Sequence, residues 1–355
     1  MSQTVTPIVA LPVSSGESDR PGRFAPLALA GYAFLILFLE LALIRYVSAY
    51  VRVFGFYLNM VLIATFLGMG VGLLRAKLAD RLSWLFLPAL PVLLIAVRFF
   101  ANVVVQPRHD QNEYLWGVFF EIAPSVRRIG ITPTVILLFA LCALVMVPLG
   151  ALLGREFRRW PALKAYSLDI AGSLAGIAAF GLMSGLRTPP VVWFAIAYVV
   201  WLALSLDRAR YAVALGLTAL PAVALVSATP PVKPEFWSPY YRINVLPRGD
   251  WATVHVNGSM HQWVVNLDKH TVNPAVAFMR SSYLRPLRLA PRLDTVLVVG
   301  AGTGNDITNL LGLGAKYIDA VEIDPVILDI GRAIHLQEPY ADPRVHPVVN
   351  DARAF

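Results

Sequence analysis

The chain has 355 residues, of which 57% are hydrophobic and 15% charged, and its formal net charge is +8. Because soluble globular chains carry about 25% charged residues, this composition argues against a soluble protein of two ordinary domains. No aromatic-basic stripe or nucleic-acid motif accompanies the positive charge, so we expect no nucleic-acid partner. The single cysteine, Cys142, excludes an intramolecular disulfide, and the six histidines show no metal-ligand spacing, so no metal site is expected.

Residues 1–24 are polar and rich in Ser, Pro and Thr, which predicts a disordered cytoplasmic tail. About seven apolar stretches follow, each near the ~20 residues that cross a bilayer. The first is too long for the core of a signal peptide, so we expect a retained anchor in the lipid bilayer. The sequence thus predicts a polytopic α-helical membrane domain over 25–228, in the inner (plasma) membrane. The expected spans are 25–47, 53–74, 82–105, 131–153, 162–184, 190–207 and 211–228.

The most basic loops, at 75–81, 155–164 and 208–210, indicate by the positive-inside rule that they and the N-terminus are cytoplasmic. With seven spans, the C-terminus would then lie on the opposite side, where a cytosolic nucleotide cofactor is absent. Either one span is wrong, for example a re-entrant segment, or the C-terminal part is not a cofactor domain. The motif described below favours the first alternative, so we expect the C-terminal domain in the cytoplasm.

Several small and ionisable residues lie inside the predicted spans. Gly172 and Gly176 form a GxxxG pattern, which predicts close contact between two helix backbones. Glu40, Arg45 and Asp169 are ionisable, and charges inside a membrane are by default candidates for a functional site. Glu40 and Arg45 could pair along the first helix. In the structural alternative, Arg45 extends to the membrane interface and Asp169 sits near the cytoplasmic end of its helix.

The long apolar stretches end at about residue 229. Short segments in which apolar and polar residues alternate follow, which predicts a small antiparallel β-domain over 229–290. The Asn257-Gly258 pair between two such segments is a strong hairpin signal. A helix is expected over 274–290, broken by Pro286. The expected strands are Arg242–Leu246, Ala252–Val256 and Gln262–Asn266.

Residues 291–355 begin with the β-branched run Thr295–Val299, which predicts a buried parallel strand. A glycine-rich turn follows, made of Gly300, Gly302 and Gly304, and a helix is expected from Asn305. Glycines at such a turn let the backbone approach a ligand, which the free N–H groups of the helix start then face.

Acidic residues follow the next two predicted strands. Ile318–Ile323 places Glu322 and Asp324 at its carboxyl end, where an acid can accept hydrogen bonds from ribose hydroxyls. After a helix over Pro325–Ile334, the strand Val345–Val349 leads to Asp351, which is placed to bind the amine of an adenine. The alternative, that the glycines only turn the chain, leaves these acids unexplained.

The spacing of the glycines distinguishes between cofactors. Dinucleotide sites have the pattern GxGxxG, whereas here Gly302 is followed by Thr303-Gly304-Asn305-Asp306. This resembles the first motif of S-adenosylmethionine-dependent enzymes, whose ligand has no pyrophosphate.

Five segments, in this order after an apolar multi-span region, resemble the membrane-bound spermidine synthase-like proteins: WSPYYRI, NGSMHQW, VVGAGTGND, VEIDPVI and DPRVHPVVNDARAF. The resemblance implies a Rossmann-like, methyltransferase-type α/β domain, of which 291–355 would be the first half. It also implies aminopropyl transfer from decarboxylated S-adenosylmethionine to an amine, and it adds Gln262 near the mouth of the active site. The predicted cofactor-binding residues are therefore Gly300, Gly302, Thr303, Gly304, Glu322, Asp324, Asp351 and Gln262.

The chain departs from this family at several positions. Thr303 stands where the soluble relatives carry an Asp beside the cofactor's amine, and Tyr241 stands where they carry a Gln. The Tyr and Glu that help to hold a diamine are missing from 278–283. The catalytic Asp would follow a fourth strand, beyond residue 355, so we expect a truncated, inactive chain whose half-sheet exposes an edge and an apolar face.

Three functions remain in view. The first is a membrane-anchored transferase that binds S-adenosylmethionine or its decarboxylated form, with an amine acceptor or, as a methyltransferase, another one. The second is a transporter or scaffold whose tail senses a nucleoside, with Glu40 and Asp169 as working residues. The third is a structural membrane protein with a decayed tail. A homo-oligomer is compatible with each of them.

Overall fold

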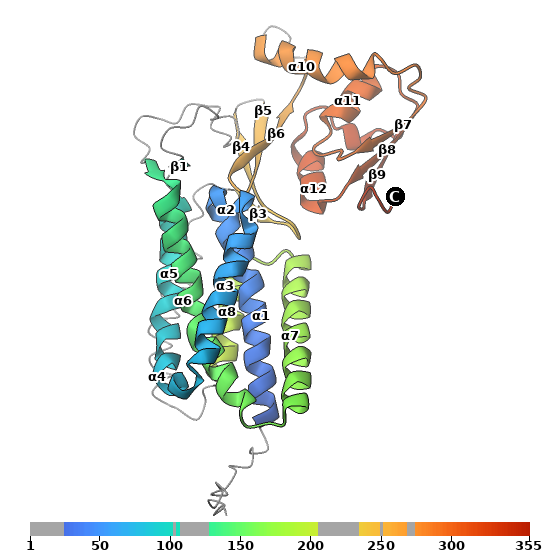
Figure 1. Ribbon diagram of the computed structural model, residues 1–355. Helices are drawn as coiled ribbons and strands as arrows, with labels where there is room; N and C mark the ends of the chain where they lie inside the picture. The colour runs from blue at the N-terminus through green and yellow to red at the C-terminus, as the bar shows by residue number, and fades with distance from the viewer. Residues whose placement is uncertain (1–24, 102–103, 107–127, 205–233, 249–250, 268–273) are drawn as a thin grey trace, which may run out of the picture.

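The computed structural model describes residues 25–101, 104–106, 128–204, 234–248, 251–267 and 274–355. The predicted tail 1–24 and the predicted span 211–228 lie outside the described residues. The described chain forms a helical bundle, a four-stranded antiparallel sheet and a three-stranded parallel sheet, together with one short strand pair (Figure 1).

The bundle consists mainly of long apolar helices. By length and composition, four helical segments of the described chain can cross a membrane: Pro26–Tyr50, Ala76–Ala101, Ile131–Phe157 and Ala162–Gly185. The main helices are α1 (Ala25–Tyr50), α3 (Leu58–Leu74), α5 (Phe86–Ala101), α6 (Ile131–Phe157), α7 (Ala162–Gly185) and α8 (Pro190–Leu204). The shorter elements are α2 (Arg52–Phe56), η1 (Ala76–Leu78), α4 (Ala79–Leu82), η2 (Ser83–Leu85), β1 (Val104–Gln106) and β2 (Arg128–Gly130).

The predicted span 53–74 is divided between two helices, and the last residues of the span predicted over 190–207 lie outside the described residues. The span predicted over 53–74 is interrupted at Tyr57, whose φ of −121° and ψ of 50° leave the helical region and separate α2 from α3. Helix α3 then has 17 residues, which at a rise of about 1.5 Å per residue is shorter than a ~30 Å hydrocarbon core. Helix α8 has 15 residues within the described chain.

Glycines allow α7 to lie directly against α1. A Cβ added to Gly172 would collide with the carbonyl oxygen of Ala30, and one added to Gly176 would approach that of Phe34 in the same way. The predicted contact between two helix backbones at this GxxxG pattern is therefore confirmed. By contrast, a Cβ added to Gly181 in the same helix would meet no atom within 4 Å.

The antiparallel sheet has the strand order β3-β4-β5-β6. The hairpin predicted at Asn257-Gly258 joins β5 to β6, but β6 begins at Ser259, earlier than predicted. Strand β3 was not predicted, because three residues are too few to show an alternating pattern. The strands are β3 (Glu235–Trp237), β4 (Arg242–Pro247), β5 (Trp251–Val256) and β6 (Ser259–Val265), and helix α10 (Pro274–Leu287) follows with Pro286 in its last turn.

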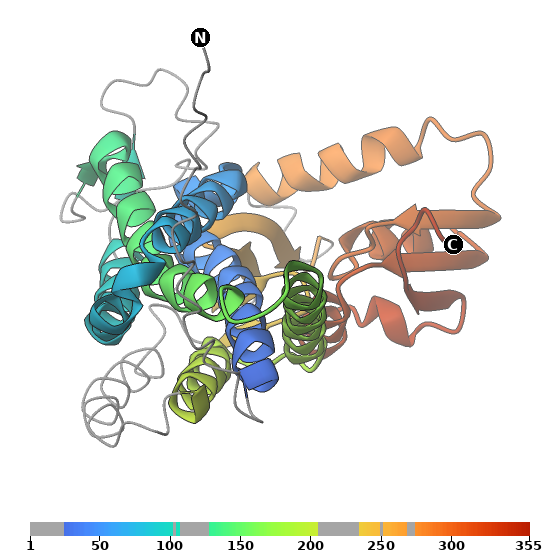
Figure 2. The same cartoon turned by 60° about the horizontal axis from the view of Figure 1, so that its bottom comes forward.

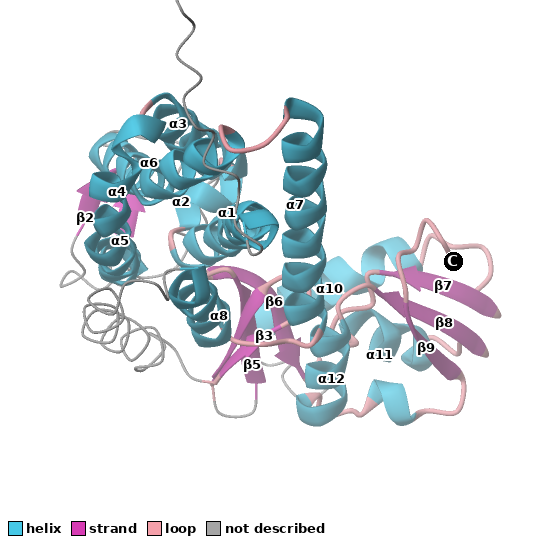
Figure 3. Cartoon of the chain, turned by 90° about the horizontal axis from the view of Figure 1, so that it is seen from below, coloured by secondary structure: helices cyan, strands magenta, loops and turns pink. Residues whose placement is uncertain are grey.

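The last part of the chain is a parallel sheet of order β7-β8-β9 with helices in its crossovers (Figure 3). One face buries Ile318 and Ala320 against Ile307 of α11. On the other face Leu297 is 51% and Val299 is 62% exposed, so the expected exposed apolar face is present, and Thr295–Val299 is not the buried strand that was predicted. The elements are β7 (Thr295–Val299), α11 (Asn305–Gly312), β8 (Tyr317–Glu322), α12 (Pro325–Ile334), η4 (Pro339–Ala341) and β9 (Val345–Val349).

Both sheets lie at one end of the bundle, and the described basic loops, 75–81 and 155–164, lie at the other (Figure 1). Ile327 and Ile330 of α12 pack against Ile243 and Val254, so α12 joins the two sheets. Seen from the second direction, α10 and the parallel sheet extend away from the bundle axis (Figure 2). At the far end the Arg155 guanidinium bridges to Asp80 at 3.0 Å, which brings the two described basic loops together.

The contact between α1 and α7 predicts a selective effect of glycine substitutions. Gly172→Ala and Gly176→Ala should each lower stability by about 1–3 kcal/mol, because α1 must move away from the new methyl group. Thermal unfolding in detergent measures the effect. Gly181→Ala, where the added Cβ meets open space, is the matched control and should unfold no earlier than the wild type. Equal loss in all three variants would contradict this packing.

The placement of the sheets predicts opposite sides for two surface positions. Lys164, at the basic end, and Arg292, beside the parallel sheet, are both exposed, whereas the native Cys142 is fully buried. In intact cells a membrane-impermeant maleimide should therefore label only one of Lys164→Cys and Arg292→Cys. The positive-inside rule assigns Lys164 to the cytoplasm. Labelling of both cysteines, with the membrane shown to be intact, would contradict the arrangement.

Candidate functional site

The predicted glycine turn joins β7 to α11 in a left-handed conformation. Gly300, Gly302 and Gly304 have φ angles of 73°, 59° and 105°, a region that residues with a Cβ adopt only at a cost. The carbonyl of Val321 in β8 accepts from the Gly300 N–H at 2.9 Å and the Ala301 N–H at 3.0 Å. The turn is thereby fixed to the end of the neighbouring strand.

Glu322 lies at the carboxyl end of β8, against this turn. Its Oε2 accepts from the Gly302 N–H at 2.9 Å, and its Oε1 accepts from the Asp324 N–H at 2.9 Å. The residue is only 6% exposed, so its carboxylate is held in one orientation. A carboxylate offers about four acceptor positions, which leaves acceptor capacity for the hydroxyls of a ligand.

Gln262 reaches from β6 onto the same turn. Its Oε1 accepts from both the N–H and the hydroxyl of Thr303, each at 3.1 Å. A Cβ on Gly302 would lie 2.5 Å from this Oε1, so a larger residue would displace the Gln262 amide from the turn. The Nε2 of Gln262 is buried and has no hydrogen-bond partner among the described residues. A ligand with a hydrogen-bond acceptor at this position would satisfy the donor and gain binding energy from the new hydrogen bond.

The other two predicted acids have partners within the chain. Asp324 is fully buried and caps α12, accepting at Oδ1 from the Val326 N–H at 2.9 Å and at Oδ2 from the Ser238 hydroxyl at 2.6 Å. Asp351 follows β9 and is bound to the Arg353 side chain at 2.6 Å, a pair that lowers the pKa of Asp351 to about 2. Asp324 thus connects the start of α12 to Ser238, which follows β3. Asp351 lies on the surface at the edge of the parallel sheet.

Tyr340 is a member of this site that the sequence did not indicate. Its hydroxyl donates to the Gly302 carbonyl at 2.7 Å, and the neighbouring Pro339 packs on Gly304. Burial raises the pKa of Tyr340, and Glu322 nearby raises it further, so the phenol remains a donor. No local pattern marks Tyr340, because it comes from a loop far along the chain from the glycines.

A buried polar network holds the start of α11. The Asn305 Nδ2 donates to the Trp263 carbonyl at 2.6 Å, and its Oδ1 lies 3.1 Å from the Nε2 of His335. The Gln337 N–H approaches His335 Nδ1 at 3.3 Å, so Nε2 carries the proton. His335 is 3% exposed, and burial lowers its pKa to about 4, which keeps the ring neutral at physiological pH.

Asp306, in the first turn of α11, is a further acid beside the glycine turn. It is half-buried and has no hydrogen-bond partner among the described residues. Burial raises its pKa, and its charge acts on both Tyr283 and Tyr340. A carboxylate in this position can neutralise a positively charged group of a ligand.

The charged residues of the predicted spans are not paired as proposed. Glu40 is buried and accepts from the Thr65 hydroxyl at 3.1 Å rather than from Arg45. The Arg45 guanidinium instead donates to the Ser184 hydroxyl and to the Ser238 carbonyl. The predicted Glu40–Arg45 pair is therefore wrong, because both side chains find partners on other elements. Asp169, in the first half of α7, is half-buried.

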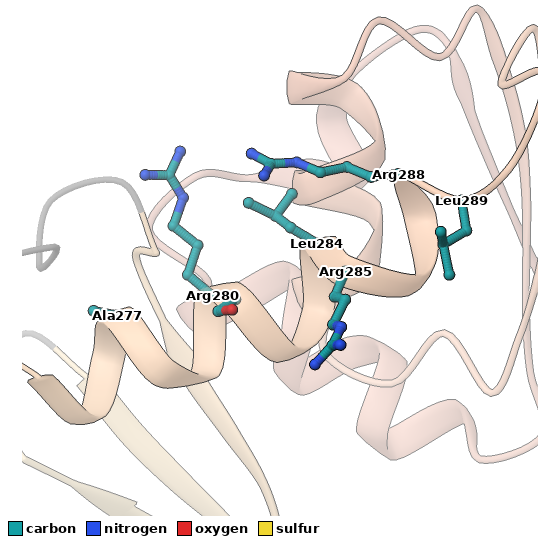
Figure 4. Close-up of a pocket in the computed structure, with 7 residues that line it drawn as sticks. Ala277, Arg280, Leu284, Arg285, Arg288 and Leu289 are labelled. Atoms are coloured by element: carbon teal, nitrogen blue, oxygen red, sulfur yellow. The ribbon is translucent and has the colours of Figure 1, made fainter.

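An open hollow of about 560 Å³ lies along one side of α10 (Figure 4). Three arginines, Arg280, Arg285 and Arg288, surround the apolar Leu284 and Leu289 there. None of the predicted cofactor residues lines it. In the described part of the chain, no group of three or more His, Cys, Asp or Glu side chains is placed to hold a metal ion.

The fold thus brings six of the eight predicted residues, Gly300, Gly302, Thr303, Gly304, Glu322 and Gln262, into one place. A scan against models of known protein families matches none of them, and no curated protein sequence matches the chain. Any functional conclusion therefore depends on this geometry and on the residues that form it.

The buried His335 predicts a loss of stability in acid. Its pKa falls from an ordinary 6.5 to about 4 on folding, so below pH 6.5 the unfolded chain binds the proton more tightly. Stability should fall by about 3 kcal/mol as the pH drops from 6.5 to 4. Urea unfolding at pH 7 and pH 4 measures this loss. In His335→Gln the loss should be smaller by that amount, and an unchanged pH dependence would contradict the assignment.

Proposed function

We propose that the C-terminal part binds a nucleoside with a sulfonium group, S-adenosylmethionine or its decarboxylated form, and that the protein is a membrane-anchored transferase. The observation that carries the proposal is the Glu322 carboxylate. It lies at the end of β8 against a glycine turn, with Gly302 and Asp324 N–H groups fixing its orientation. An acid in this position accepts hydrogen bonds from ribose hydroxyls.

Three further features support a ligand of this kind. The strand order β9-β8-β7, read from the edge, is that of the first half of a nucleotide-binding doubly wound sheet. The Gln262 Nε2 is a buried donor without a partner among the described residues. Asp306 provides negative charge beside the turn, where Thr303 replaces the acid expected by the family resemblance. These groups fit a cationic nucleoside.

The chemistry would be transfer of a carbon group from sulfur to a nucleophile. When bound, the sulfonium ligand supplies an electrophilic carbon, and the broken C–S bond leaves its electron pair on sulfur. The chain's own residues bind and orient: Glu322 holds the ribose, Gln262 covers the turn and Asp306 neutralises charge. Orientation of the reacting groups is itself a large contribution to the rate of such a transfer.

The residues of helix α10 favour one class of acceptor substrate over another. No acidic residue occurs between residues 274 and 292, where the resemblance places the groups that hold a diamine. Arg280 and Arg285 in this helix and Arg288 directly after it instead make this segment basic. Because like charges repel, this favours an acceptor that is not a diamine, and therefore favours methyl transfer or a non-polyamine nucleophile.

Titration of the full chain in lipid nanodiscs with S-adenosylmethionine and with its decarboxylated form tests the proposal. Glu322→Gln should weaken binding about 10- to 100-fold, because hydrogen bonds to a charged group contribute about 1.5–3 kcal/mol. Asp319→Asn, on the same strand, is the matched control and should bind like the wild type.

The two ligands separate the possible reactions. Tighter binding of the decarboxylated form would indicate aminopropyl transfer, and tighter binding of S-adenosylmethionine would indicate a methyltransferase. If a folded wild-type chain binds neither, the transferase proposal is wrong.

The position of the basic loops favours a second candidate, a membrane scaffold or transporter whose C-terminal part senses a nucleoside. A transferase with this cofactor needs its C-terminal domain on the cytoplasmic side of the plasma membrane, where the cofactor is made. The positive-inside rule places the basic end there instead, and the two sheets at the opposite side. Labelling of Arg292→Cys from outside would therefore favour the second candidate.

A further inference from the structure

We propose that Arg45 and Ser238 are positioning residues, through which the helical bundle sets the orientation of Glu322. The contacts that form this relay are observed in the structure and do not depend on the proposed function. Its consequence for ligand binding rests on the proposed function.

The relay begins at the end of α1. The Arg45 guanidinium lies 5.0 Å from the centre of the Trp193 ring and 5.4 Å from that of Trp237. It donates to the Ser184 hydroxyl in α7 and to the Ser238 carbonyl after β3. One cation therefore connects two bundle helices, α1 and α7, to the antiparallel sheet.

Ser238 carries the connection to the parallel sheet. It is fully buried, and its Oγ accepts from the Tyr241 N–H at 2.8 Å, which orients the hydroxyl. The hydroxyl donates to Asp324 Oδ2 at 2.6 Å. Hydrogen bonds to a buried carboxylate are among the strong ones, and the loss of one leaves the charge without its partner.

Asp324 transmits its position to the glycine turn. Its N–H donates to Glu322 Oε1 at 2.9 Å, and Glu322 Oε2 accepts from the Gly302 N–H at 2.9 Å. A shift of Asp324 therefore moves the Glu322 carboxylate directly. The relay runs from Arg45 through Ser238, Asp324 and Glu322 to Gly302.

A second contact between the bundle and α12 provides a matched control. Arg187, in the turn after α7, pairs with Asp329 at 3.0 Å, and both side chains are about half exposed. Arg187→Gln removes an arginine contact to the same helix without touching the relay. Ser238→Thr is the conservative variant, since it keeps the hydroxyl that Ser238→Ala removes.

Hydrogen–deuterium exchange on the full chain in nanodiscs, without ligand, tests the relay. Ser238→Ala and Arg45→Gln should each speed exchange of the Gly302 amide at least about tenfold, while Ser238→Thr and Arg187→Gln should leave it as in the wild type. A purely local role would change exchange only near Ser238 and the first turn of α12. If Ser238→Ala does not fold, Arg45→Gln, at the far end of the relay, decides the matter.

Unchanged exchange at Gly302 in folded Ser238→Ala or Arg45→Gln would overturn the relay, and so would an equal rise in Arg187→Gln. In the binding assay, Ser238→Ala should weaken nucleoside binding about tenfold and Arg187→Gln should not. A wild-type chain that binds no nucleoside contradicts the proposed function, whereas the exchange result still decides the relay.

Discussion

Arg45, at the junction of bundle and sheets, connects α1 and α7 to the antiparallel sheet. A guanidinium beside apolar helices is costly unless its donors find acceptors. Two of the Arg45 nitrogens find them on α7 and after β3, and its buried Nε has no hydrogen-bond partner among the described residues. Its guanidinium also contacts two tryptophan rings, Trp193 and Trp237, which meet each other edge-on with ring centres 5.0 Å apart. The end of the bundle and the start of the antiparallel sheet must therefore keep one relative position.

Helix α12 extends this constraint to the candidate site. Its apolar side chains pack on the antiparallel sheet, while its N-terminus is capped by Asp324, which Ser238 holds. A Cβ on Gly331 would lie 2.7 Å from the Thr303 Cα, so α12 also rests directly on the glycine turn. Packing between the sheets and geometry of the turn are thus not independent, and the site cannot form fully without the antiparallel sheet.

Local chemistry explains what could be predicted from the sequence. The β-branched strand, the glycine turn and the helix after Pro325 are encoded within a few residues each, and all are present. Partners distant in sequence could not be predicted. The pattern placed Glu322 and Asp324 alike at a strand end, but Ser238, 86 residues before Asp324, determines that Asp324 is structural. Tyr340 and the Thr65 partner of Glu40 were missed for the same reason.

Two independent physical requirements meet in the orientation of the bundle. The difference in charge between the loops orients the helices during membrane insertion, independently of the folded C-terminal domain. The sulfonium nucleoside that we propose as the ligand would be available only on the cytoplasmic side, whatever the charge of the loops. In the described chain they assign opposite sides to the two sheets, because the basic loops and the glycine turn lie at opposite ends of the same helices. A single orientation can satisfy only one of them, so the side on which α12 lies determines whether Glu322 can meet such a ligand in the cell.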